Sequence, residues 1–263
     1  MILDEIVAYK KIEVARRESS VPLSTVRSLA AKARIPRDFA SALKAPGISL
    51  IAEVKYKSPS KGVLRQDFDP LELAHIYALN GARAISVLAD EHFFGGSTSL
   101  VQRIANATDI QIPILFKDFI LSPYQVYEAR TTGADALLLI VRTLDQSMLE
   151  ELLAIAHELG MEALVEVYQL EEAERALAAG ARIIGVNNRD LQTFEVDTAR
   201  SEAIRAILPR EILSVSESGL SSRADVMRAE GSGFDAMLVG EALVKVPDVG
   251  ARVREFLGLS LLS

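Results

Sequence analysis

Charged side chains follow apolar runs at several points of this sequence, where buried strands would end. The first such run, Leu50 to Ala52, is followed by Glu53 and Lys55. Because side chains alternate between the two faces of a strand, Glu53 and Lys55 should point the same way. An inward charge must be paired or used, since burying an unpaired ion is costly. The end of this strand is therefore a candidate active site, with a structural ion pair as the alternative interpretation.

Four later apolar runs also end in polar side chains. They supply Lys117, Glu166, Asn187, and the pair Glu217 and Ser218. A single strand that ends in polar side chains is commonly just a solvated edge of a sheet. Five strands whose polar ends lie together favour a functional site. Lysines and glutamates in one pocket suit general acid–base catalysis, because burial and neighbouring charges can move their pKa values towards neutrality. A Schiff base on a lysine is a second possibility.

Glycine turns after the last two apolar runs predict a phosphate site. The turns are Ser218-Gly219 and Gly240-Glu241, and we expect each to lead directly into a helix. Backbone N–H groups at such turns bind phosphate, and the hydroxyl of Ser58 could add a donor from the first loop. Ordinary turn glycines are the alternative. The carboxylate of Glu241 should face away from a bound phosphate.

Aromatic side chains are scarce, at 6% of the sequence, yet three follow neighbouring apolar runs. Phe93, Phe94 and Phe119 would lie just beyond the second and third strands. Phenylalanine usually packs in a core. At these positions we favour an apolar wall for a substrate ring.

A glycine repeatedly separates a helical pattern from an apolar run rich in β-branched residues. Glycine suits the left-handed conformation that closes a helix, so each instance predicts a helix followed by a strand. The five instances are Gly81, Gly133, Gly160, Gly180 and Gly233. Eight strands are predicted in all, within 49–55, 82–88, 112–118, 134–141, 161–167, 181–187, 212–218 and 234–240.

Eight strand–helix units favour an α/β fold, a single closed (βα)8 TIM barrel over residues 1–263. An open doubly wound sheet is the alternative, but no GxGxxG motif follows the first strand to support a dinucleotide site. Residues 1–45 form an N-terminal helical extension, with one helix from Ile2 to beyond Val14 and a short second helix within Leu23 to Ala33. The extension could plug the bottom of the barrel or cover its active-site end.

Composition limits the function further. The 263 residues contain no cysteine, which excludes disulfides, thiolate metal sites and a cysteine nucleophile. The net charge of −7 opposes binding to nucleic acid or to anionic membranes, although Lys55, Lys57, Lys61 and Arg65 suggest a local basic pocket. Neither a membrane span nor a basic leader is evident, so we expect a cytoplasmic protein. Its histidines are too scattered to build a metal site.

At this point the segments resemble a known family, indole-3-glycerol phosphate synthase, along nearly the whole chain. The resemblance rests on ILDEIVAYKKIEVA, IAEVKYKSPSKG, FFGGS, ILFKDFI, GADALLLIV, LVEV, IGVNNRDL, SESG and LVGEAL, in this order. It implies a (βα)8 fold and a carboxy-lyase of tryptophan biosynthesis without metal or organic cofactor. The substrate would be a phosphorylated small molecule, 1-(2-carboxyphenylamino)-1-deoxyribulose 5-phosphate, and a monomer is the simplest assembly.

The resemblance also implies roles for the polar strand ends. Lys117 would be the general acid that protonates the substrate ketone, and Glu166 would be the base of later steps. Glu53 and Asn187 would assist dehydration or orient neighbours, while Lys55 would pair with the substrate carboxylate and could donate a proton. The positions that would bind substrate are Ser58, Phe94, Phe119, Leu138, Arg189, Leu191, Glu217, Ser218, Gly219, Gly240 and Glu241. Position 241 is often serine in relatives.

Two other functions compete with this one. Phosphoribosylanthranilate isomerase is another phosphate-binding barrel, but it is usually shorter and its first strand ends in a cysteine base that this chain lacks. A non-catalytic protein that binds a phosphorylated metabolite is the second alternative. Buried lysines and glutamates would then reduce stability without a catalytic use, which disfavours that alternative.

Overall fold

The computed structural model describes residues 2–59, 61–67, 69–190 and 196–259. Eight parallel strands form a closed barrel in the order β1-β10-β9-β8-β7-β6-β5-β4. All eight predicted strands are confirmed, and the open-sheet alternative is wrong. The strands are β1 (Ser49–Val54), β4 (Ala84–Leu88), β5 (Ile114–Lys117), β6 (Ala136–Ile140), β7 (Glu162–Val167), β8 (Ile183–Asn187), β9 (Leu213–Glu217) and β10 (Ala236–Val239).

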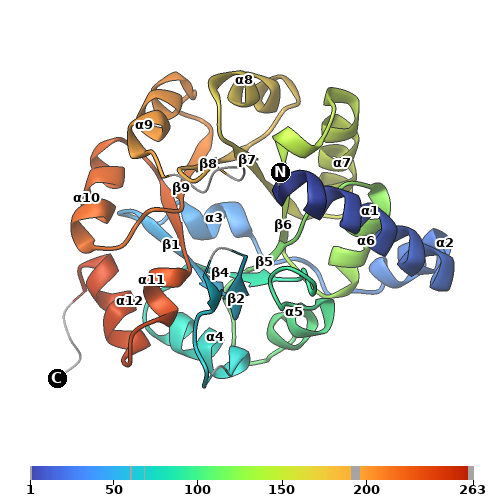
Figure 1. The fold of residues 1–263 in the computed structure, drawn as a ribbon, viewed down its shortest axis with the longest axis horizontal. Helices are drawn as coiled ribbons and strands as arrows, with labels where there is room; N and C mark the ends of the chain where they lie inside the picture. Colours follow the sequence, from blue (N-terminus) through green and yellow to red (C-terminus); the bar gives the residue numbers. More distant parts are fainter. Residues whose placement is uncertain (1, 60, 68, 191–195, 260–263) are drawn as a thin grey trace.

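A ring of helices surrounds the barrel (Figure 1). These are α4 (Pro70–Leu79), α5 (Thr98–Ala105), α6 (Pro123–Thr131), α7 (Gln146–Glu158), α8 (Leu170–Ala178), α9 (Thr198–Ile207), α10 (Arg223–Gly231), α11 (Glu241–Val244) and α12 (Val249–Leu257). The five predicted glycines all have positive φ, between 73° and 104°, which a residue with a side chain rarely adopts. They end helices and return the chain to the barrel. Apolar side chains between helices and strands form the larger core.

Inside the barrel, an apolar layer lies below the polar strand ends. Ile51, Leu115, Leu164 and Val215 belong to one buried apolar cluster. Two residues further along each of these strands, on the same face, stand Glu53, Lys117, Glu166 and Glu217. Because residues two apart share one face of a strand, these four charged side chains lie directly above the four apolar ones, at the C-terminal end of the barrel.

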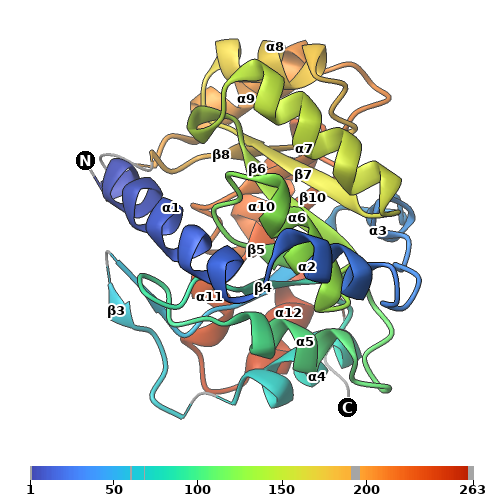
Figure 2. The ribbon, with the colours of Figure 1, turned by 90° about the vertical axis from the view of Figure 1, so that its right-hand side faces the viewer.

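The N-terminal extension reaches both ends of the barrel (Figure 2). Helix α1 (Ile2–Ser20) packs Leu3 and Ile6 into the barrel cluster and lies at the end where the first loop forms a small hairpin, β2 (Lys57–Ser58) and β3 (Gly62–Val63). Helix α2 (Leu23–Ala30) follows, as predicted. Helix α3 (Phe39–Leu43), which the sequence reading did not predict, lies at the opposite end. Helix α1 therefore lies at the hairpin end of the barrel, whereas α3 lies at the other end.

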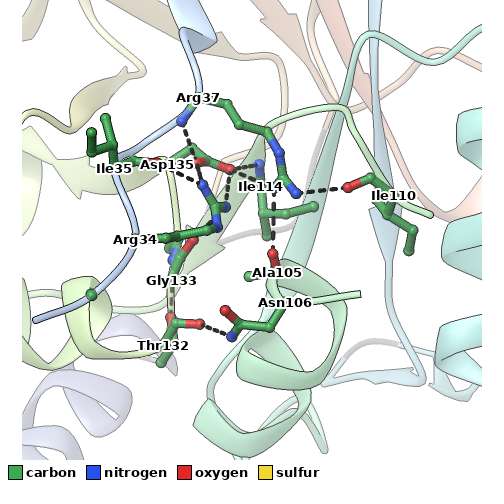
Figure 3. A network of polar contacts seen from close by, with 12 residues as sticks. Arg34, Ile35, Arg37, Ala105, Asn106, Ile110, Ile114, Thr132, Gly133 and Asp135 are labelled. Atoms are coloured by element: carbon green, nitrogen blue, oxygen red, sulfur yellow. Dashed lines mark hydrogen bonds and ion pairs between the residues drawn. The ribbon is translucent and has the colours of Figure 1, made fainter. Parts of the chain in front are cut away.

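Asp135 ties the linker before α3 to the N-terminal end of the barrel (Figure 3). Its buried carboxylate accepts hydrogen bonds from the backbone N–H groups of Ile114, at 2.7 Å, and Arg37, at 2.6 Å. It also pairs with the Arg34 Nη1 at 2.7 Å and with the Arg37 Nη1 at 3.3 Å. Both carboxylate oxygens are thereby bonded, so this buried charge is fully satisfied.

Candidate active site

A cavity of about 490 Å³ opens at the C-terminal ends of the strands. This volume is in the range that holds a small metabolite. Of the predicted site residues, fifteen line it, namely Glu53, Lys55, Ser58, Phe94, Lys117, Phe119, Leu138, Glu166, Asn187, Arg189, Glu217, Ser218, Gly219, Gly240 and Glu241. The sixteenth, Leu191, lies outside the described residues.

Lys117 lies between two carboxylates. Its Nζ is 3.6 Å from Glu166 Oε2 and 3.9 Å from Glu217 Oε2, and the lysine side chain is 16% exposed. Burial alone would lower the pKa of Lys117, but the charges of Glu166 and Glu217 outweigh it, and the pKa is raised above its ordinary value. The amine therefore stays an ammonium at neutral pH, which suits an acid better than a Schiff-base nucleophile.

Glu217 is a buried carboxyl group with a raised pKa. Burial, and next the nearby charge of Glu166, raise the pKa of Glu217 well above its ordinary value, against the attraction of Lys117. Only 1% of Glu217 is exposed, and its Oε1 has no hydrogen-bond partner among the described residues. The group is therefore suited to hold a proton beside Lys117.

Glu53 and Lys55 point the same way, as the alternation predicted. Lys55 Nζ lies 3.1 Å from Glu53 Oε1, so the two residues form an ion pair. Both also line the cavity. Burial would raise the pKa of Glu53, but Lys55 and Lys117 outweigh it and lower the pKa. Asn187 Nδ2 donates to Glu166 Oε1 at 3.1 Å, and its Oδ1 accepts from the Arg189 backbone at 3.0 Å. Asn187 thus fixes the orientation of the Glu166 carboxylate.

Two glycines make room for the buried carboxylates. A Cβ on Gly185 would overlap Glu217 Oε1, and a Cβ on Gly240 would lie 2.7 Å from Glu53 Oε1. Sequence reasoning missed the role of Gly185. The available signal was a glycine inside a β-branched strand, which often marks a close approach by another group.

The predicted phosphate turns line the cavity, with one correction. Ser218 and Gly219 adopt positive φ, 65° and 76°, but α10 begins only at Arg223, so this turn does not lead directly into a helix. Gly240 does precede α11 directly. The Ser58 hydroxyl is buried at the cavity and has no hydrogen-bond partner among the described residues, which leaves it available to a ligand.

Glu241 does not stand alone at this turn. Its Oε1 lies 2.6 Å from Lys61 Nζ and 2.7 Å from Lys245 Nζ, and these side-chain hydrogen bonds lower the pKa of Glu241 although burial opposes them. Sequence reasoning missed Lys245, together with Arg252, which also lines the cavity. The i,i+4 spacing of Glu241 and Lys245 was the signal for the first.

The predicted basic pocket is only half right. Lys55 and Lys61 line the cavity, whereas Lys57 Nζ donates to the His92 carbonyl at 3.0 Å and Arg65 donates to the carbonyls of Val244 and Val246, at 3.4 and 3.3 Å. These last two residues hold the first loop instead. Such contacts depend on how a loop folds back, which the sequence alone does not give.

The aromatic wall consists of two of the three predicted rings. The centroids of Phe94 and Phe119 lie 6.0 Å apart, and Lys55 Nζ lies 5.8 Å from the Phe94 centroid. Phe93 instead packs edge-on against Tyr9 of α1, with centroids 5.7 Å apart. Its prediction as part of the wall is therefore wrong, because the preceding helix takes up this ring.

Barrels of this kind place their reactive groups at the C-terminal ends of the strands, and this chain is a TIM barrel whose cavity opens at that end. The family model for indole-3-glycerol phosphate synthase matches residues 3–256. The chain belongs to that family, and its members act on a phosphorylated small molecule.

Individual relatives agree with this assignment. Proteins named indole-3-glycerol phosphate synthase from Dehalococcoides mccartyi and Roseiflexus sp. are 49% and 52% identical to the chain, over 98% of it and over 100% and 98% of their own lengths. A solved 3-hexulose-6-phosphate synthase superposes with a TM-score of 0.65 at 15% identity, covering 81% of this chain and all of that one. This last likeness concerns the fold alone.

In the described part of the chain, no helix has the length and apolar character to cross a bilayer.

Proposed function

We propose that the protein closes 1-(2-carboxyphenylamino)-1-deoxyribulose 5-phosphate into indole-3-glycerol phosphate, with release of carbon dioxide and water. The observation that carries this proposal is the Lys117 ammonium between Glu166 and Glu217 inside the cavity. Ring closure needs a proton at the ketone oxygen, and the Lys117 ammonium would supply it. Family membership supplies the identity of the substrate.

In the first step, the ring carbon that bears the carboxylate bonds to the ketone carbon. Lys117 gives its proton to the ketone oxygen, which becomes a hydroxyl. Loss of carbon dioxide then returns its bonding electrons to the six-membered ring. The buried carboxylates around Lys117 favour its charged form, so the proton is present when substrate arrives.

Dehydration completes the indole. Lys55 protonates the new hydroxyl, which leaves as water. Glu166 removes a proton from the CH2 between the nitrogen and the former ketone carbon, so that the five-membered ring becomes aromatic. Asn187 holds the Glu166 carboxylate through the 3.1 Å hydrogen bond, and Glu53 holds Lys55 at 3.1 Å as a second proton donor. Each step thus has a named acid or base from this chain.

The rest of the cavity would position the substrate. Phe94 and Phe119 would hold the aromatic ring, and Lys55 would pair with the substrate carboxylate. The two glycine turns and Ser58 would bind the phosphate, with backbone N–H groups as donors. Leu138 and Arg189 complete the wall.

Product formation can be followed directly, because the chain contains no tryptophan and indole fluorescence would come from product alone. The wild-type protein should develop this fluorescence with the proposed substrate, and Lys117→Ala should lower kcat by about 10²- to 10⁴-fold. Lys44→Ala, an exposed lysine next to α3, is the matched control and should be fully active. A folded wild-type protein that gives no signal would contradict the proposed function, and an active Lys117→Ala variant would contradict the assigned acid.

A further inference from the structure

Lys10 is a fully buried lysine that the chemistry above does not use. It lies on α1 with 0% of its side chain exposed. Its Nζ is 2.9 Å from Asp90 Oδ2 and 2.8 Å from Asp118 Oδ1, and both aspartate side chains are also 0% exposed. Glu13 adds a third carboxylate at 2.8 Å. One ammonium from the N-terminal extension thus joins two carboxylates of the barrel.

Asp90 organises the turn that presents an aromatic ring to the cavity. It stands two residues beyond the end of β4. Its Oδ1 accepts hydrogen bonds from the backbone N–H groups of Phe93, at 2.7 Å, and Phe94, at 3.0 Å. The other oxygen, Oδ2, is the one that faces Lys10. The position of the Phe94 ring therefore depends on where the Asp90 carboxylate is held.

Asp118 organises the backbone at the end of the neighbouring strand, β5, where it directly follows Lys117. Its Oδ1 accepts from the Phe119 backbone N–H at 2.8 Å and also faces Lys10. The carboxylate therefore fixes the short backbone segment that carries both the proposed acid and the second ring of the aromatic wall. Phe94 and Phe119 face each other across the cavity wall at 6.0 Å.

We propose that Lys10 is a positioning residue, which sets the spacing of the Phe94 and Phe119 turns, and the place of Lys117 beside them, through Asp90 and Asp118. This inference rests on the proposed function. Lys10 reaches the substrate only through these turns, because it does not itself line the cavity. Helix α1 is thereby part of the active-site architecture.

The charge of the cluster supports this role. Burial would lower the pKa of Lys10, but Asp118 and Asp90 outweigh it and raise the pKa, so the ammonium persists. Buried ion pairs are weak sources of stability, and apolar residues of similar size often serve as well. An ionic cluster that bridges two substrate-facing turns is therefore better explained by the geometry it imposes.

A purely structural anchor for α1 makes a different prediction. Losing an anchor lowers the melting temperature and leaves the folded protein fully active. Losing a positioning residue changes KM and kcat in the protein that remains folded. Displacements of about 1 Å far from the chemistry can cost on the order of 10²-fold in rate.

The test compares Lys10→Met with Lys11→Met, the next residue of the same helix, which is exposed. Assays well below the melting temperature of each variant, with folding checked by circular dichroism, should show kcat/KM of Lys10→Met reduced by on the order of 10²-fold. Most of this loss should appear as a raised KM, because the aromatic wall is disturbed on both sides. Lys11→Met should match the wild type.

A second variant covers the case in which Lys10→Met does not fold. Lys10→Met with Asp90→Asn and Asp118→Asn removes the three fully buried charges together, and Glu13 keeps Arg17 as its partner. Each new amide oxygen can still accept from the backbone N–H groups. It should fold and still show the raised KM. Values within about twofold of the wild type for this variant, or for a folded Lys10→Met, would overturn the proposal. An inactive wild type would instead count against the proposed function.

Discussion

The two ends of the barrel use buried charge in opposite ways. At the N-terminal end, the Asp135 carboxylate accepts two backbone hydrogen bonds and pairs with Arg34 and Arg37 (Figure 3). At the C-terminal end, Lys117 faces Glu166 and Glu217 at 3.6 and 3.9 Å, beyond close hydrogen-bond contact, in an open cavity. The charge of Asp135 is satisfied, whereas the charge of Lys117 is available to a substrate.

This difference separates stability from activity within one fold. The Asp135 network fixes the linker before α3 to the barrel, and both carboxylate oxygens already have partners. The Lys117 cluster keeps groups with shifted pKa values in a shared space, which is typical of sites that move protons. Substitutions at the two ends should therefore have separable effects.

The largest expected effect is on activity, from Glu166→Gln. The amide oxygen can still accept from Asn187 Nδ2, so the architecture should persist while the base is lost. We expect kcat to fall by about 10²- to 10⁴-fold with little change in melting temperature. Steady-state kinetics by indole fluorescence measures this.

The matched control for this variant lies on the same strand. Glu162→Gln changes the first residue of β7, at the N-terminal end of the barrel. There, Glu162 Oε2 lies 3.4 Å from Arg182 Nη2. Its turnover should equal that of the wild type. Equal losses in both variants would show that the two ends of the barrel are not functionally distinct.

The next effect is on stability, from Asp135→Ala. Removing one partner of a buried ion pair typically costs about 3–5 kcal/mol, and partial exposure of Arg34 and Arg37 places this site at the lower end. Urea unfolding should show that loss, while kcat below the melting temperature stays at the wild-type value. Asp109→Ala, at an exposed carboxylate, should leave the urea midpoint at the wild-type value. A large fall in kcat for Asp135→Ala would contradict the separation.

The sequence predicted the parts of the site that depend on strand period. Glu53 with Lys55, and the strand ends at Lys117 and Glu166, follow from alternation and from the eight glycine-marked units. Contacts that need a loop or helix to fold back were not predicted. Phe93 packs against Tyr9 of α1, and Lys57 donates to the His92 carbonyl. Segments distant in sequence decide where these side chains lie. Lys10 was missed for the same reason.

A third effect concerns pH and the raised pKa of Glu217. The folded state holds this proton more tightly than the unfolded chain does. The resulting stability is therefore fully present below the ordinary carboxyl pKa, and it is lost as pH rises through the raised folded value. Wild-type stability should fall relative to Glu217→Gln over this interval, by at most about 1.4 kcal/mol per pH unit.

Urea unfolding of both proteins from about pH 5 to about pH 8 measures this difference. Glu211→Gln is the control, because Glu211 is exposed just ahead of the same strand and should show the pH dependence of the wild type. Parallel pH profiles for the wild type and Glu217→Gln would mean that Glu217 titrates as an ordinary carboxyl group. The C-terminal end would then resemble the N-terminal end more closely than its geometry indicates.

The smallest expected effect comes from adding one methyl group at Gly185. A Cβ there would overlap Glu217 Oε1, which is the far end of a flexible side chain, so the carboxyl group should move and the backbone should not. Stability should therefore change little, whereas kcat should fall by about tenfold as Glu217 leaves its place beside Lys117. Gly231→Ala is the control, because its Cβ would meet nothing within 4 Å at the end of α10. Full turnover by Gly185→Ala would show that the site tolerates a displaced Glu217 carboxyl group. Glu217 would then differ from Asp135 also in how precisely its position must be held.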